Sequence, residues 1–165
     1  MEVLAEVERS GFVESRHLGV VVVADADGGL LATAYARLGA RAAAGEEGPG
    51  ALVEAVRRHP FMLSGTGQLD TLLVEATGGR ILAKVGAEAG YGAVDLERGA
   101  GVALKVIDGA PRARGAALLA VLRALGWLDD DQWAAVLPAA TVEIRGGGLP
   151  VGAVRPAKVD LSRPE

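Results

Sequence analysis

The stretch GTGQLDTLLVEATGGRILAKVGAE, residues 65 to 88, joins a predicted helix to the strand that follows it. Residues 70–76 are expected to form a short helix that ends at Gly78 and Gly79, because glycine commonly follows the last turn of a helix. Residues 80–87 then read as a strand whose apolar run contains one lysine, Lys84. The chain has three lysines against fourteen arginines, and a lysine can lose its proton when desolvated, whereas an arginine effectively cannot. Lys84 is therefore a candidate for a chemical role.

Further elements are predicted on both sides of this stretch. Alternating or continuous apolar runs predict strands at 3–9, 18–24, 30–35, 90–95 and 102–107. An Asp/Gly turn at 25–29 is expected to join the second and third of these strands as a hairpin. Helices are expected at 49–59, at 111–125 and after the three aspartates at 129–131, and residues 141–144 and 151–154 could add edge strands. The pattern predicts an α+β fold with a mainly antiparallel sheet flanked by helices.

Length and composition indicate a single domain and argue against nucleic-acid-binding and membrane-spanning proteins. The 165 residues fit a single domain, with 41–50 (RAAAGEEGPG) as a connector that lacks periodicity. The net charge of −4 argues against a nucleic-acid partner. The apolar runs are too short for a membrane span, and the acidic N-terminal sequence favours a cytoplasmic location. The chain has no cysteine and no asparagine, which fits either a thermophile or an Ala/Gly/Arg-rich genome.

Two blocks of sequence resemble the rhizobial-type L-asparaginase family. The first block is ERSGFVESRHLGVVVVADADG, residues 8 to 28. The second runs from RRHPFMLSGTGQLDTLLVEATGGRILAKVGAE to GVALKVIDGAPRARGAALLAVLRALG, within residues 57 to 126. The blocks occur in the family's order and cover most of the chain. The resemblance implies a fold akin to that of serine β-lactamases and glutaminases.

The chain departs from the family between these two blocks. Family members are longer and carry there a mostly helical region with a Ser-x-x-Lys stretch and a cysteine-bearing zinc segment. Here about ten residues near 41–50 take its place, and no Ser-x-x-Lys occurs in the sequence. The resemblance therefore implies the sheet domain alone, with no zinc cofactor.

On this resemblance Lys84 matches the lysine of the family's second Ser–Lys pair, in which a base must take the proton of a serine hydroxyl. The family's serine belongs to the missing region. Ser15 and Ser64 are the candidates to replace it, with Thr66 as a hydroxyl substitute. Ser15 is favoured, because Ser64 would need its loop to fold over the sheet. Even so, we expect Ser15 to lie beyond about 6 Å from Lys84, with the ammonium in solvent.

Four positions are candidates for substrate binding. Glu14 and His17 flank Ser15 in the Glu-Ser-x-His segment, where alternate side chains point to the same side of an extended chain; the same residues could simply fix a turn. Thr66 lies in a short glycine-rich segment. Asp70 matches a position that is cysteine in zinc-binding members, but its residue type favours the N-cap of the helix that follows. A single carboxylate would make a poor zinc site.

The resemblance implies hydrolysis of L-asparagine to L-aspartate and ammonia by descent. We expect weak or no activity, because the Ser-x-x-Lys and zinc segments are missing. The alternative is a non-catalytic interaction module. Loss of a helical region would expose an apolar face, and such faces tend to become interfaces. A homodimer through that face is the expected form of this alternative.

Overall fold

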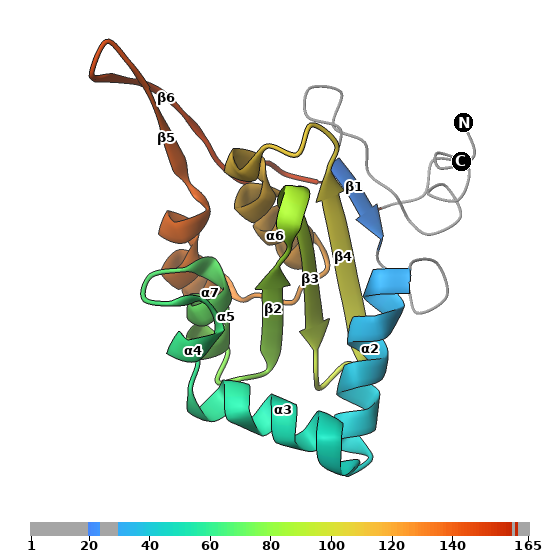
Figure 1. Ribbon diagram of the computed structural model, residues 1–165. Helices are drawn as coiled ribbons and strands as arrows, with labels where there is room; N and C mark the ends of the chain where they lie inside the picture. Colours follow the sequence, from blue (N-terminus) through green and yellow to red (C-terminus); the bar gives the residue numbers. More distant parts are fainter. Residues whose placement is uncertain (1–19, 24–29, 160, 162–165) are drawn as a thin grey trace, which may run out of the picture.

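The computed structural model describes residues 20–23, 30–159 and 161, and its centre is a four-stranded sheet (Figure 1). The strands are β1 (Val20–Val23), β2 (Ile81–Val85), β3 (Gly90–Asp95) and β4 (Ala100–Val106). Their order is β1-β4-β3-β2, and every neighbouring pair is antiparallel. The strand that carries Lys84 therefore lies at one edge of the sheet, and β1 lies at the other.

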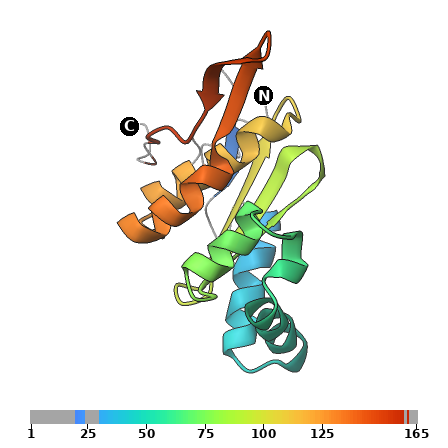
Figure 2. The same cartoon turned by 90° about the vertical axis from the view of Figure 1, so that its left-hand side faces the viewer.

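Helices lie on both faces of this sheet (Figures 1 and 2). One face is covered by α2 (Leu30–Ala43) and α3 (Glu47–Arg58), and the other by α6 (Pro111–Ala124). The remaining helical elements are α4 (Phe61–Ser64), α5 (Leu69–Ala76), α7 (Asp130–Val136) and the short 3-10 turns η1 (Ala87–Ala89) and η2 (Leu137–Ala140). The fold is α+β, as the sequence predicts.

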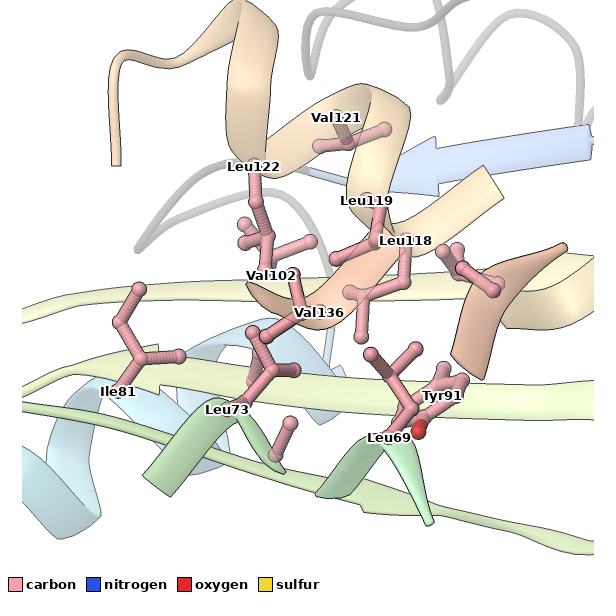
Figure 3. Packing of buried hydrophobic residues seen from close by; sticks show 14 of the residues in the cluster. Leu69, Leu73, Ile81, Tyr91, Val102, Leu118, Leu119, Val121, Leu122 and Val136 are labelled. Carbon is pink, nitrogen blue, oxygen red and sulfur yellow. The ribbon is translucent and has the colours of Figure 1, made fainter. Parts of the chain in front are cut away.

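The alternation of side chains along each strand divides the core in two. On the α6 face, residues such as Ile81, Val102 and Leu118 form the larger buried cluster, which Figure 3 shows from close by. On the opposite face, Leu82 and Val94 pack with residues of α2 and α3 in a smaller cluster. Because successive strand residues point to opposite faces, burial on both sides makes β2 and β3 almost continuously apolar.

Glycines let α2 approach the sheet closely. A Cβ at Gly101 would lie 2.1 Å from the carbonyl oxygen of Ala32, and a Cβ at Gly92 would lie 2.1 Å from Cε2 of Tyr35. Real Cβ atoms do not tolerate such distances, so only glycine admits the helix backbone and the Tyr35 ring at these two places. Gly92 pairs in register with Lys84, and the Tyr35 ring thus lies over the strand next to that lysine.

Several sequence predictions of the fold are confirmed. Strands lie within or close to 18–24, 80–87, 90–95 and 102–107, and helices close to 49–59, 70–76 and 111–125. The strand predicted at 3–9 lies outside the described residues. Residues 142–146 and 149–154 do form strands, β5 (Val142–Gly146) and β6 (Leu149–Val154). They pair only with each other within the described chain, as a two-stranded arm that projects from the body (Figure 1).

Two predictions around residues 30–50 are wrong. The strand expected at 30–35 is the start of helix α2, whose buried residues Ala32, Ala36 and Gly39 follow helical spacing toward the sheet. The connector expected at 41–50 is the end of α2, a turn and the start of α3. The hairpin expected between residues 18–24 and 30–35 therefore does not form, and β1 pairs with β4 instead.

Candidate functional site

Lys84 is held between a serine and an aspartate at the edge of the sheet. Its Nζ atom donates to Oγ of Ser64 at 2.8 Å and to Oδ2 of Asp70 at 3.2 Å. Ser64 is the last residue of α4, and Asp70 lies in the first turn of α5. The short α4 turn after Pro60 thus folds the chain back over β2. The three groups lie within hydrogen-bonding distance of one another, because Ser64 Oγ also donates to Asp70 Oδ2 at 2.5 Å.

The carboxylate of Asp70 is the centre of this cluster. Its side chain is 2% exposed, whereas that of Lys84 is 44% exposed. Besides Ser64 and Lys84, it accepts hydrogen bonds from the Val85 backbone N–H at 3.2 Å and from the Tyr91 hydroxyl. The Val85 N–H lies on the edge strand, so Asp70 also satisfies a backbone donor of the sheet edge. Four donors converge on one buried carboxylate.

Two tyrosines near Asp70 keep their protons. Burial raises the pKa of the Tyr91 hydroxyl above its usual value, and the Asp70 charge and the hydrogen bond to Asp70 raise it further. The positive charge of the Arg114 guanidinium lowers the pKa of Tyr91 and so offsets part of this rise. Burial, followed by the Asp70 charge, also raises the pKa of Tyr35. Both hydroxyls are therefore hydrogen-bond donors near neutral pH.

A small polar cavity of about 170 Å³ opens beside Ser64 and Asp70. Tyr91, Arg112 and Arg114 also line it. Arg112 is exposed and bonds Asp108 at 3.1 Å, while Arg114 is half-buried. The cavity thus combines a serine hydroxyl with two guanidinium groups, which recognise carboxylates in a planar, bidentate geometry.

The structure describes three of the six residues predicted for the site. Lys84 and Asp70 lie together, and Thr66 lies in the exposed turn between α4 and α5, two residues after Ser64. Ser15, Glu14 and His17 lie outside the described residues, so their roles stay predictions.

One expectation about a side chain at this site is wrong, and a second is not tested. Asp70 is not the N-cap of α5, because that position belongs to Gln68 and the Asp70 carboxylate makes no capping bond. Ser15 is favoured over Ser64 as the partner of Lys84, yet α4 brings Ser64 Oγ to 2.8 Å from Nζ; whether Ser15 lies closer stays a prediction, because Ser15 lies outside the described residues.

Tyr91 and the two arginines are functional candidates that the sequence reasoning missed. Tyr91 offered one signal, since a tyrosine inside an apolar strand must find a partner for its hydroxyl. Arg114 sits in the first turn of α6 beside apolar residues, and nothing in its local sequence distinguishes it from a solvated surface arginine.

The described cluster around Asp70 does not fit a zinc ion. The chain has no cysteine, and both carboxylate oxygens of Asp70 already accept hydrogen bonds. Within the described part of the chain, no three His, Asp or Glu side chains gather in a group that could hold a metal. In the same residues, no helix is long and apolar enough to cross a bilayer.

Comparison with known proteins supports an asparaginase-family relationship for the part of the chain that contains the second sequence block. Among curated proteins, none matches the chain. The model of the family described as L-asparaginase II matches residues 29–156. This match covers most of the chain and includes Ser64, Asp70 and Lys84, the whole of the cluster at the sheet edge. The chain therefore belongs to the L-asparaginase II family.

Proposed function

We propose that this chain hydrolyses the side-chain amide of L-asparagine, slowly, with Ser64 as the nucleophile. The observation that carries the proposal is the hydrogen bonding of Ser64 Oγ, which donates to Asp70 and accepts from Lys84. A serine hydroxyl is a weak nucleophile until a neighbouring group takes its proton. Asp70 Oδ2 is the acceptor that this geometry offers.

The reaction would proceed through an ester of Ser64. Oγ attacks the amide carbon and its proton passes to Asp70, while the Lys84 ammonium faces the oxygen that gains negative charge. The carbon–nitrogen bond then breaks, and the proton returns to the nitrogen as ammonia leaves. Water attacks the ester with Asp70 again taking a proton, which releases aspartate and restores the Ser64 hydroxyl. One asparagine and one water thus give one aspartate and one ammonia.

The amino-acid end of the substrate fits the polar cavity. The α-carboxylate of asparagine would pair with Arg114, which is half-buried and lines the cavity together with Asp70 and Tyr91. The Arg114 charge lowers the pKa of Tyr91, so the guanidinium acts on the groups of this site. Binding a carboxylate there would place the side-chain amide toward Ser64. This arrangement uses one guanidinium for binding and leaves Lys84 for the reacting carbonyl.

The rate should be low for two physical reasons. Lys84 is 44% exposed, so water weakens the electrostatic stabilisation it gives to a developing oxyanion. The Ser-x-x-Lys stretch of longer relatives is also missing from the sequence. We infer that the chain corresponds to the sheet domain of a β-lactamase-like architecture and keeps only part of that architecture's catalytic groups.

Ammonia release from L-asparagine tests the proposal. We expect slow release by the wild-type chain, loss of at least ten-fold in Ser64→Ala, and a raised KM in Arg114→Gln. Arg58→Gln is the matched control, because Arg58 is an exposed arginine that pairs with Glu54 on α3. Equal rates in the wild type and Ser64→Ala would refute Ser64 as the nucleophile.

A non-catalytic homodimer is the second candidate function. Leu52, Phe61 and Met62 expose large apolar side chains on α3 and α4, with Met62 at 78% exposure. A symmetric contact through this face would bury them in a partner copy. Sedimentation equilibrium at high micromolar concentration tests this candidate, and a monomer that hydrolyses asparagine would refute it.

A further inference from the structure

A second cavity, larger and apolar, lies on the other side of the Ser64–Lys84 pair. Its volume is about 350 Å³, within the range of small-molecule sites. Helices α2 and α3, the end of α4 and strand β2 form its walls. Its lining consists of Ala34, Tyr35, Leu38, Leu52, Val56, Leu63, Leu82, Ala83 and Lys84. Lys84 is the one charged residue of this lining.

The chemistry of this cavity differs from that of asparagine. A zwitterionic amino acid would leave its ammonium and carboxylate among leucine and valine side chains, and unpaired charges are costly to bury. A hydrocarbon group, in contrast, gains by leaving water in proportion to its buried apolar area. The cavity therefore favours an alkyl or aryl group over the proposed substrate.

Lys84 supplies a polar end to the apolar cavity. An ammonium group has three N–H donors, and Ser64 and Asp70 accept two of them. The third donor belongs to a side chain that is 44% exposed, and among the described residues no acceptor is assigned to it, so it can meet an oxygen of a ligand. A carboxylate there would receive a charge-assisted hydrogen bond, the stronger kind.

Tyr35 shapes the wall next to this lysine. Its ring lies over Gly92, the residue paired with Lys84 across the sheet. Because a Cβ at position 92 would collide with the ring, only glycine there lets the Tyr35 ring lie beside this end of the cavity. The Tyr35 phenol adds a second donor to this wall, close to the polar end.

We propose that the cavity binds a carboxylate with an alkyl chain of medium length, with the chain between α2, α3 and β2 and the carboxylate at Lys84. Since Lys84 also donates to Ser64, an oxygen bound there lies beside the Ser64 hydroxyl. A medium-chain amide in the same pose would present its carbonyl to Ser64, and water would convert it to the carboxylate and ammonia. Only this last step rests on the proposed function.

Isothermal titration calorimetry with octanoate tests the site directly. We expect a dissociation constant on the order of 0.1 to 1 mM, and at least ten-fold weaker binding for octanol, which has the same chain length without the charge. Lys84→Met should weaken octanoate binding about ten-fold and leave octanol binding unchanged. Ala34→Trp should abolish both, because Ala34 is an exposed lining residue whose enlargement fills the cavity.

Ala40→Trp is the matched control, since Ala40 is an exposed alanine of α2 outside the lining, and it should bind octanoate like the wild type. Equal affinity for octanoate and octanol would overturn the role of Lys84. Absence of octanoate binding would overturn the site, and a dimer that Ala34→Trp dissociates would then assign the cavity to a second copy of the chain.

Ammonia release from octanamide and from asparagine, measured beside octanoate binding, separates this inference from the proposed function. Octanoate binding without ammonia release from either amide would refute the proposed hydrolysis and leave the site standing. Ammonia release from asparagine without octanoate binding would refute the site and leave the hydrolysis standing.

Discussion

Asp70→Ala should destabilise the chain by about 2–5 kcal/mol. The substitution removes the acceptor of four donors without affecting the hydrophobic core directly. The buried Tyr91 hydroxyl loses its partner, at a cost of about 1–3 kcal/mol, and the half-buried Val85 N–H adds about 1 kcal/mol. Lys84 is partly exposed and can be rehydrated, so its lost ion pair contributes at most about 1 kcal/mol. In a chain of this size the loss corresponds to a Tm lower by roughly 4–20 °C.

Urea unfolding of three variants measures this magnitude. Asp70→Asn keeps one carbonyl acceptor and should lose roughly half as much stability as Asp70→Ala. Asp108→Ala is the matched control, because Asp108 is an exposed carboxylate that pairs with Arg112, and such pairs contribute about 0–1 kcal/mol. The m-value should stay constant in all three, since no change in the surface exposed on unfolding is expected.

A double-mutant cycle tests the reasoning behind the number. If the unpaired Tyr91 hydroxyl causes much of the loss, Tyr91→Phe in the Asp70→Ala background should restore stability, with a coupling of at least about 1 kcal/mol. The reasoning is refuted if Asp70→Ala unfolds within about 0.5 kcal/mol of the wild type, as the control should.

Three further predictions concern the interior. Gly92→Ala should cost about 1–3 kcal/mol in thermal unfolding, because its Cβ would overlap the Tyr35 ring; an unchanged Tm would contradict the close contact. Asp95→Ala should cost about 3–5 kcal/mol in urea unfolding, since it leaves the mostly buried Arg80 without its ion-pair partner, and a loss below 1 kcal/mol would count against that pair. Burial raises the pKa of Tyr91 above 10.0, so the native state keeps a proton that the unfolded state loses. The free energy of unfolding should therefore fall as pH rises above about 10. In a titration of the native state followed at 295 nm, Tyr91→Phe should match the wild type between pH 9 and 11, because Tyr91 stays protonated there.

The sequence predicts the elements whose signals are local. The β2–β3–β4 meander follows from apolar runs separated by glycine turns, and α6 from its proline start and its face of leucines. Helix α2 was missed because its first residues, LLATAYA, read as an apolar run after a turn. Its second half, RLGARAA, consists largely of good helix formers and extends into the segment 41–50, which lacks the periodicity that would predict a helix.

The site could be predicted only in part, because its geometry depends on tertiary packing. Lys84 stood out through its place in an apolar strand, and Ser64 was a candidate. The pairing of these two depends on the single turn of α4 after Pro60, and four residues carry too little periodicity to predict such a turn. Asp70 has the residue type of a helix cap, and its burial against β2 and Tyr91 overrides that local preference.

The pairing of β1 with β4 has a consequence for synthesis of the chain. Val23 lies opposite Ala103, so at ribosomal rates the partner of β1 emerges roughly 4–16 s after β1 itself. The strands β2, β3 and β4 are joined by short turns and can pair while β1, a run of four valines, has not yet met its partner strand β4. We expect β1 to join the sheet last, as the step most exposed to aggregation during translation.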